Sequence, residues 1–211
     1  MRALGILLGL LSGVVSCAMT PPAGVVGEQQ AASASDSGAV AKTRQDLPGA
    51  DARPVLEAAR LNGQAPRIDG RLDEDTWDLA AAATDFVQIR PDEGDAATER
   101  TEARALYNDD ALYIGVRAFD SDPSGIEGQL TRRDQESFSD WVYVAIDSYN
   151  DQRTAFPFGV NPKGVKQDVY RYDDTRVDPD WDAVWDAGTS VDEPGWTAES
   201  RIPPPPPRLP A

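Results

Sequence analysis

The chain has 211 residues, and its 36 acidic against 20 basic side chains give a formal net charge of −16. This balance disfavours nucleic acid and anionic lipid headgroups as partners, because both are bound through Lys and Arg. The sequence contains no His and a single Cys, which excludes Ser-His-Asp triads, His-ligated zinc and an intramolecular disulfide. What remains is the chemistry of carboxylates, hydroxyls, aromatic rings or a hard cation such as calcium.

Residues 1–17 are predicted to be a lipoprotein-type signal peptide. Arg2 precedes an apolar run from Ala3 to Val15, which is too short for a transmembrane helix of ~20 residues. The small residues directly before Cys17 resemble the lipobox of bacterial lipoproteins. That resemblance implies a lipid on Cys17 as the only attachment to the membrane and, because Ala18 follows, an exported outer-membrane lipoprotein facing the periplasm or the cell surface. The alternative is an ordinary signal peptide that contains a Cys.

A compositional change separates a tether from a folded domain. Residues 18–53 lack aromatic side chains and are rich in Ala, Ser, Gly, Gln and Pro, a composition that predicts a disordered segment. All 16 aromatic residues lie between Trp77 and Trp196. We therefore expect the folded domain to span residues 54–202.

Within this domain the pattern is mostly that of β-strands. Leu112, Ile114, Val116 and Ala118 alternate with more polar or bulkier residues, which is the period of a half-buried strand. The strands that we expect on such grounds are 104–107, 111–119, 140–147, 154–160, 165–172 and 195–202. Pro157 predicts an edge strand or a bulge at 154–160. One short helix is expected at 73–83, capped by Asp73. Short strands at regular spacing predict an all-β fold, a β-sandwich of jelly-roll type.

The last segment, 203–211, begins with five consecutive prolines. Polyproline offers no sheet hydrogen bonds, so the strand that ends at Ile202 looks interrupted. We favour a truncated or frame-shifted gene over a natural proline-rich tail.

Four segments together resemble a known family: Ile68 to Trp77, Ala103 to Asp120, Asp140 to Asp147 and Gly195 to Pro203. They are similar to the family 9 carbohydrate-binding module, above all to the version at the N-terminus of large bacterial outer-membrane proteins. The resemblance covers residues 55–203 and implies a β-sandwich, in agreement with the strand pattern. The copy is expected to be incomplete at its C-terminus.

Candidate sugar-binding residues follow from the chemistry of this family. Its sugar-binding members hold a sugar between two tryptophans, but one clamp position falls where Phe138 is the only nearby aromatic residue, and the other lies beyond the chain end. The clamp is therefore not carried over. Trp141, Trp181 and Trp185 are our candidates for a different binding platform for an oligo- or polysaccharide, with plain packing aromatics as the alternative.

The same resemblance implies structural calcium in sugar-binding members. Asp120, Asp140 and Asp147 stand at the ends of predicted strands, where carboxylates can converge on Ca²⁺. A solvated acidic face is the alternative interpretation.

Three functions are compatible with these features. The first is a non-catalytic, envelope-anchored carbohydrate-binding module associated with carbohydrate catabolism. The second is an accessory or interaction domain of an outer-membrane β-barrel protein that no longer binds sugar. The third is part of a glycoside hydrolase, which requires two carboxylates flanking the scissile bond; the sequence singles out no such pair, so we predict no catalytic residues.

Overall fold

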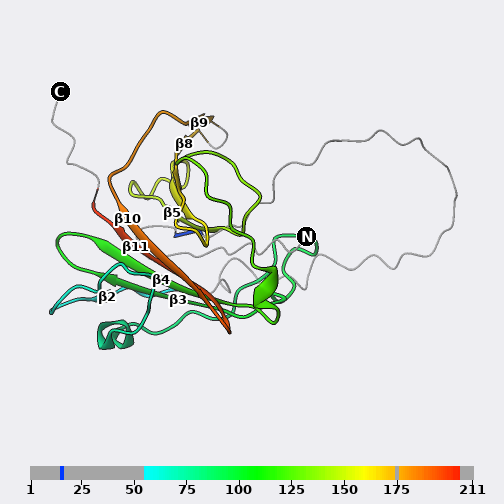
Figure 1. Cartoon of the computed structure of the whole chain (residues 1–211). Helices are drawn as coiled ribbons and strands as arrows, with labels where there is room; N and C mark the ends of the chain where they lie inside the picture. Colours follow the sequence, from blue (N-terminus) through cyan, green and yellow to red (C-terminus); the bar gives the residue numbers. More distant parts are fainter. Residues whose placement is uncertain (1–14, 17–54, 174–175, 205–211) are drawn as a thin grey trace, which may run out of the picture.

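The computed structural model describes residues 15–16, 55–173 and 176–204. Strands dominate these residues, and they form two sheets that face each other (Figure 1). The prediction of an all-β sandwich is confirmed. The predictions for Cys17, for the tether 18–53 and for residues 205–211 lie outside the described residues, and of the predicted signal peptide only Val15 and Ser16 are described.

The larger sheet has five strands in the order β10-β11-β4-β3-β2. All neighbours are antiparallel except β2 and β3, which run parallel. The strands are β10 (Asp186–Asp192), β11 (Gly195–Ile202), β4 (Leu112–Phe119), β3 (Thr101–Tyr107) and β2 (Ala59–Arg60).

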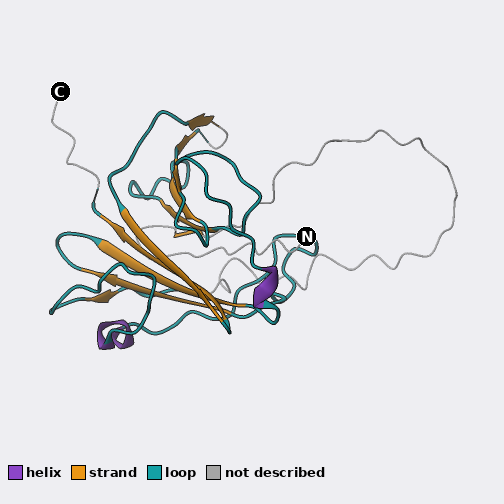
Figure 2. Cartoon of the chain, viewed as in Figure 1, coloured by secondary structure: helices purple, strands orange, loops and turns teal. Residues whose placement is uncertain are grey.

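The second sheet has the order β1-β5-β6-β7, and a hairpin of β8 and β9 lies beside it (Figure 2). Both are antiparallel throughout. The strands are β1 (Val15–Ser16), β5 (Val142–Ile146), β6 (Phe156–Val160), β7 (Lys166–Asp168), β8 (Tyr170–Tyr172) and β9 (Arg176–Asp178). Each strand expected from the pattern is present, but 165–172 is divided between β7 and β8.

The position of Pro157 corrects one expectation. β6 is an inner strand between β5 and β7, whereas the proline predicts an edge or a bulge. The carbonyl of Pro157 accepts a hydrogen bond from the backbone N–H of Val169, so this residue directs its backbone groups away from β5. On the side of β6 that faces β7, strand β7 has already ended at Asp168. The N–H that Pro157 lacks would therefore have had no partner in the ladder, and no ladder hydrogen bond is lost.

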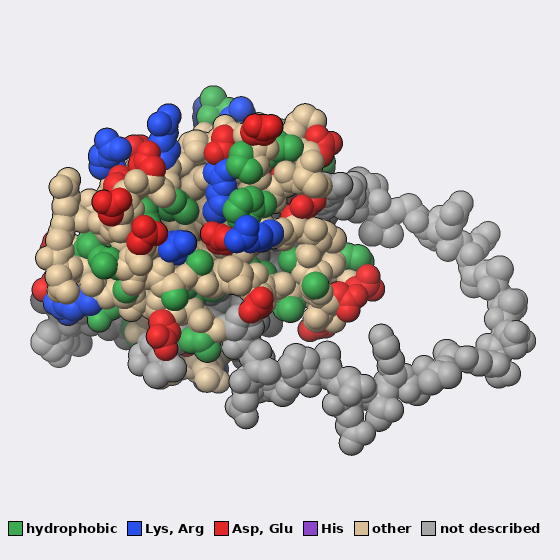
Figure 3. Space-filling model, turned by 90° about the horizontal axis from the view of Figure 1, so that it is seen from below, with side chains coloured by type: hydrophobic (Ala, Val, Ile, Leu, Met, Phe, Trp, Pro, Cys, Tyr) green, Lys and Arg blue, Asp and Glu red, His purple; other side chains and the backbone are tan. Residues whose placement is uncertain are grey.

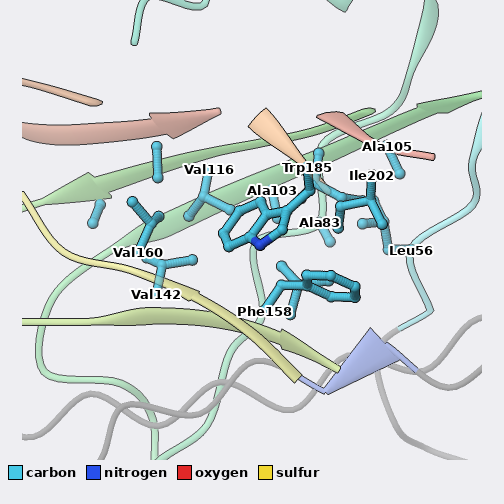
Figure 4. Packing of buried hydrophobic residues seen from close by; sticks show 14 of the residues in the cluster. Leu56, Ala83, Ala103, Ala105, Val116, Val142, Phe158, Val160, Trp185 and Ile202 are labelled. Carbon is cyan, nitrogen blue, oxygen red and sulfur yellow. The ribbon is translucent and has the colours of Figure 1, made fainter. Parts of the chain in front are cut away.

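The hydrophobic core fills the space between the two sheets. Figure 4 shows the Trp185 ring pointing into this space, between Val116 of one sheet and Phe158 of the other. The Trp185 and Phe158 rings meet edge to face, with centroids 5.3 Å apart, a favourable arrangement for aromatic pairs.

A smaller apolar cluster covers the opposite face of the five-stranded sheet. Trp77, Leu106 and Tyr113 are buried in it, and Trp77 comes from the 3₁₀-helix η2 (Asp75–Leu79). The predicted helix 73–83 is thus wrong in its length and its cap: it has five residues and follows Glu74, which makes no side-chain cap hydrogen bond. The chain becomes extended at Ala80 and then forms a bridge to Ala103 of β3, so sheet pairing ends the helix. A second short 3₁₀-helix, η3, spans Pro123–Gly125.

The surface mixes charge signs. On the face shown in Figure 3, acidic and basic side chains are interspersed with small apolar areas. Among the described residues, no helix has the length and apolar character needed to cross a membrane.

Candidate functional site

A cleft of about 770 Å³ opens between the two sheets at one end of the sandwich. Its walls come from the β3–β4 turn at 107–112, the turn after β5 at 146–149, strands β6 and β8, the loop 181–184, and the end of β11 at 202–204. The elements far apart in sequence meet here because both sheets contribute strand ends to the same edge of the core.

Aromatic rings form much of the cleft wall. The aromatic residues that line it are Tyr107, Tyr149, Phe156, Phe158, Tyr170 and Trp181. The Phe156 ring stacks on Tyr170 with centroids 4.9 Å apart, and Trp181 is tilted against Phe156 at 4.9 Å. Because these rings contact one another, they restrict each other's motion and form a continuous apolar surface.

Carboxylates lie on two sides of this apolar wall. Asp109 and Asp182 both line the cleft and are largely exposed. Asp109 pairs with Arg60 at 2.8 Å, and Asp182 pairs with Arg133 at 2.5 Å. Each carboxylate is therefore held by one guanidinium and retains oxygen lone pairs for further hydrogen bonds.

The structure separates the three tryptophans predicted to form a binding platform. Trp181 is half-buried and lines the cleft, as a binding residue must. Trp185 is wrong as a platform residue: it is 2% exposed, in the core, and its Nε1–H donates to Asp168 at 3.1 Å. Trp141 is wrong for the same reason, since it is 3% exposed and stacks on Tyr143 with centroids 5.7 Å apart. Neither ring offers a face to a ligand.

Sequence reasoning missed the remaining aromatic residues of the cleft. They come from one turn and three different strands, and they are Tyr107, Tyr149, Phe156, Phe158 and Tyr170. The alternation of Tyr170 and Tyr172 in the predicted strand 165–172 shows that they share one face. Nothing in the sequence tells which surface that face meets.

The three predicted calcium ligands do not meet at one site, although Asp120 neighbours Asp140. Asp140 and Asp147 flank opposite ends of β5, and a rise of about 3.3 Å per residue separates them by roughly 20 Å. Asp147 is buried, and its carboxylate accepts the backbone N–H groups of Tyr149, Asp151 and Gln152. Across the described residues, no group of three or more acidic or Cys side chains is placed to hold a metal. The set of Asp120, Asp140 and Asp147 is therefore wrong as one site, and calcium binding stays a prediction without assigned ligands.

Burial also affects the carboxyl of Asp140. Its Oδ2 accepts the backbone N–H of Glu127 at 3.0 Å. Burial, with a smaller contribution from the neighbouring Asp120, raises the pKa of Asp140 above the ordinary aspartate value, against the lowering effect of this hydrogen bond. A carboxyl that resists ionisation is a weaker calcium ligand.

Glu199 is fully buried, at 0% exposure. Its Oε2 accepts the backbone N–H groups of Asp69, Gly70 and Arg71 at 2.7–3.2 Å, and its Oε1 accepts Nε1–H of Trp77 at 3.2 Å. Burial raises the pKa of Glu199 to about 7, although the backbone hydrogen bonds act in the opposite direction. This residue fastens residues 69–71 and η2 to the sheet, lies outside the cleft lining, and has a structural role.

Comparison with known proteins identifies the class of fold. No protein-family model matches the chain, and no curated protein matches it. Among solved structures, it is similar to a family 9 carbohydrate-binding module from Caldicellulosiruptor kristjanssonii in complex with glucose, with 16% identity, a TM-score of 0.51, and coverage of 72% of each chain. The same kind of module from that organism in complex with cellotriose is 17% identical, with a TM-score of 0.49 and coverage of 70% of this chain and 67% of that one. The chain therefore has a fold like that of family 9 carbohydrate-binding modules, as the sequence motifs predict.

Proposed function

We propose that this chain is a non-catalytic carbohydrate-binding module whose ligand lies in the aromatic cleft. The observation that carries the proposal is the cleft wall of six aromatic residues together with the carboxylates of Asp109 and Asp182. The two similar structures hold glucose and cellotriose, which agrees with a ligand of this class.

The chemistry of a neutral sugar fits such a wall. A pyranose ring has apolar C–H faces, which are favourably removed from water against aromatic surface. Its hydroxyls lie around the edge of the ring and need acceptors there. The carboxylates of Asp109 and Asp182 stand at the sides of the cleft, where they can accept such hydroxyl hydrogens.

The cleft also has the dimensions of a ligand site. Its volume of about 770 Å³ falls within the roughly 300–1,000 Å³ typical of small-molecule pockets. Lys and Arg are missing from the side chains that line it in the described part of the chain. We therefore propose a neutral oligosaccharide rather than a uronic acid or a sulfated glycan.

Titration calorimetry with cellotriose tests the proposal. Trp181→Ala removes one half-buried ring of the cleft wall, and we expect the dissociation constant for cellotriose to rise at least about ten-fold. Phe138→Ala is a matched control, because Phe138 is an exposed aromatic residue outside the cleft lining. An effect of Phe138→Ala with none of Trp181→Ala would move the site to the loop that contains Phe138. Absence of binding by the unaltered chain to glucose, cellotriose and other neutral oligosaccharides would refute the function.

One observation favours a second candidate, an interaction domain. Val184 is 89% exposed at the cleft, and Tyr107 and Tyr149 beside it are also exposed. An apolar rim of this kind is typical of protein docking surfaces. Val184→Asp distinguishes the two functions: it would abolish docking of an apolar partner segment, whereas cellotriose affinity should change less than about three-fold if the sugar stacks on Trp181.

We further propose that the domain is exported and anchored to the envelope through a lipid on Cys17. The support is the lipobox-like sequence before Cys17. Mass spectrometry of the chain expressed in a Gram-negative host, beside its Cys17→Ser variant, tests this: only the unaltered chain should start at a diacylated Cys17. An unmodified Cys17 would refute the anchor and leave the cleft proposal unaffected.

A further inference from the structure

The cleft wall that contains Trp181 and Asp182 is fixed at one residue, Ala183. The backbone N–H of Ala183 donates to Oδ2 of Asp168 at 2.6 Å. The carbonyl of the same residue accepts Nη2–H of Arg133 at 2.7 Å. The loop 181–184 is thus held at the N–H and at the C=O of one residue by two charged side chains that come from other parts of the fold.

Asp168 and Arg133, which both hydrogen-bond to Ala183, also hydrogen-bond to each other. Asp168 is 1% exposed on β7. Its carboxylate accepts Nε–H of Arg133 at 3.1 Å, a second bond from the Arg133 Nη2, and Nε1–H of Trp185. Together with the N–H of Ala183, four donors hydrogen-bond to this carboxylate. A charged group in the protein interior requires such partners.

Arg133 also contacts a carboxylate of the cleft lining. Its Nη2 contacts Oδ1 of Asp182 at 2.5 Å, so one guanidinium joins the buried Asp168 to a carboxylate that lines the cleft. Burial acts to lower the pKa of Arg133, but the hydrogen bond with Asp168 and the charges of Asp168 and Asp182 raise it on balance. The guanidinium therefore stays charged and keeps its planar fork directed at both partners.

We infer that Arg133 is a positioning residue for the binding site: with Asp168 it holds Trp181 and Asp182 in the arrangement that receives the ligand. The inference rests on the proposed binding of oligosaccharide in the cleft and extends it to residues that lie outside the cleft lining. Arg133 acts through Asp182 and through Ala183, without contact to the ligand.

Other contacts maintain the core when Arg133 is changed. Lys166 donates from Nζ to the Trp185 carbonyl at 2.6 Å, and its ammonium lies 5.2 Å from the centre of the Trp185 ring. Trp185 also packs edge to face on Phe158. Loss of the Arg133 fork should therefore loosen the 181–184 loop and leave Trp185 in the core.

The test uses the full chain and the variants Arg133→Met, Arg133→Lys and Asp182→Asn. Arg133→Met removes the fork and keeps the length of the side chain, and Arg133→Lys keeps the charge without the fork. Arg100→Met is the matched control, because Arg100 pairs with Glu102 at the other end of β3 from the cleft. We measure cellotriose affinity by calorimetry and amide hydrogen exchange at Ala183.

We expect Arg133→Met to weaken cellotriose binding about ten-fold and to raise exchange at the Ala183 amide at least about ten-fold. Arg133→Lys should lie between this variant and the unaltered chain, and Arg100→Met should change neither quantity. The double variant with Asp182→Asn should be little weaker than the stronger single variant, because Arg133 acts through Asp182. A purely structural role would instead give additive losses.

Two failures are distinguishable. If the unaltered chain binds cellotriose and Arg133→Met binds it equally well, or if the two losses add, the inference is wrong and the proposed function stands. If the unaltered chain binds no oligosaccharide, the proposed function is wrong and this inference falls with it. Unchanged exchange at Ala183 in Arg133→Met overturns the inference in either case.

Discussion

Removal of the Glu199 carboxylate is the sharpest test of how this sandwich is held together. In Glu199→Ala, four N–H groups lose their acceptor at once: those of Asp69, Gly70 and Arg71 and the Trp77 indole. The Gly70 and Trp77 donors are buried, and each buried donor without a partner costs about 1–3 kcal/mol. The two partly buried donors recover water at a smaller cost.

We therefore expect Glu199→Ala to lower the free energy of unfolding by about 3–5 kcal/mol, a large share of the roughly 5–15 kcal/mol that stabilises a domain. Urea denaturation followed by tryptophan fluorescence measures this as a fall in the midpoint at constant slope. Glu102→Ala is the control, because the Glu102 carboxylate pairs at the surface with Arg100 and should cost less than about 1 kcal/mol.

A conservative variant separates the hydrogen bonds from the charge. Glu199→Gln keeps one carbonyl oxygen for the backbone donors but places an amide N–H₂ against the indole N–H of Trp77, so that two donors face each other. Adding Trp77→Phe removes this conflict but leaves a cavity in the buried cluster, so the loss of stability in the double variant should be smaller than the sum of the two single losses. A loss below about 1 kcal/mol in Glu199→Ala would refute the acceptor role, and we would then assign the stability of this region to the apolar packing of Trp77 alone.

The remaining predictions concern pH and packing. Burial raises the pKa of Glu199 to about 7, so the folded chain binds the proton of this carboxyl more tightly than the unfolded chain does. Protonation of Glu199 therefore stabilises the fold in full below about pH 4.5. The free energy of unfolding should fall by up to about 3 kcal/mol as the pH rises through 7. Urea midpoints measured from pH 4 to 8 should show this fall, and the fall should vanish in Glu199→Gln. Trp185→Ala should lower the free energy of unfolding by about 3–5 kcal/mol, because it removes a ring from the core. Trp181→Ala should lower it by less than half as much in the same assay. Equal losses would contradict the different burial of the two rings. Gly159→Ala should cost at least about 1 kcal/mol, because the new Cβ would lie 2.3 Å from the Tyr143 ring; Gly63→Ala, with nothing within 4 Å, should be neutral in thermal unfolding.

Strand periodicity predicted much of the sandwich because local chemistry decides it. In β4 the alternation places Ile114, Val116 and Ala118 in the core, and the structure confirms this face. β10 was not predicted: Asp186–Asp192 contains Gly188 and acidic ends and lacks an apolar face. It forms a strand because it is paired along its whole length with β11 in a hairpin that turns between Asp192 and Gly195, and strand pairing of this kind does not require an apolar face.

The candidate site shows the limit of the same reasoning. Aromatic composition predicts a binding surface made of rings, and Trp181 is one of the rings that line the cleft. The sequence cannot tell Trp181 from Trp185, four residues later, although one lines the cleft and the other fills the core. The difference arises because Asp168 and Arg133 hold Ala183 between them, and these partners lie 15 and 50 residues away in the chain.

The sequence by itself determined the strand-rich core, the acidic balance of charge and the resemblance to family 9 carbohydrate-binding modules, since each depends on residue type and short-range spacing. Tertiary structure alone decided which carboxylates meet and which rings stay accessible. Glu199 alternates away from the core in β11, as a solvent-facing residue would, yet it is fully buried because the Ile68–Gly70 segment and η2 cover that face of the sheet. Asp140 and Asp147 look alike as strand-flanking acids, yet the length of β5 keeps them apart.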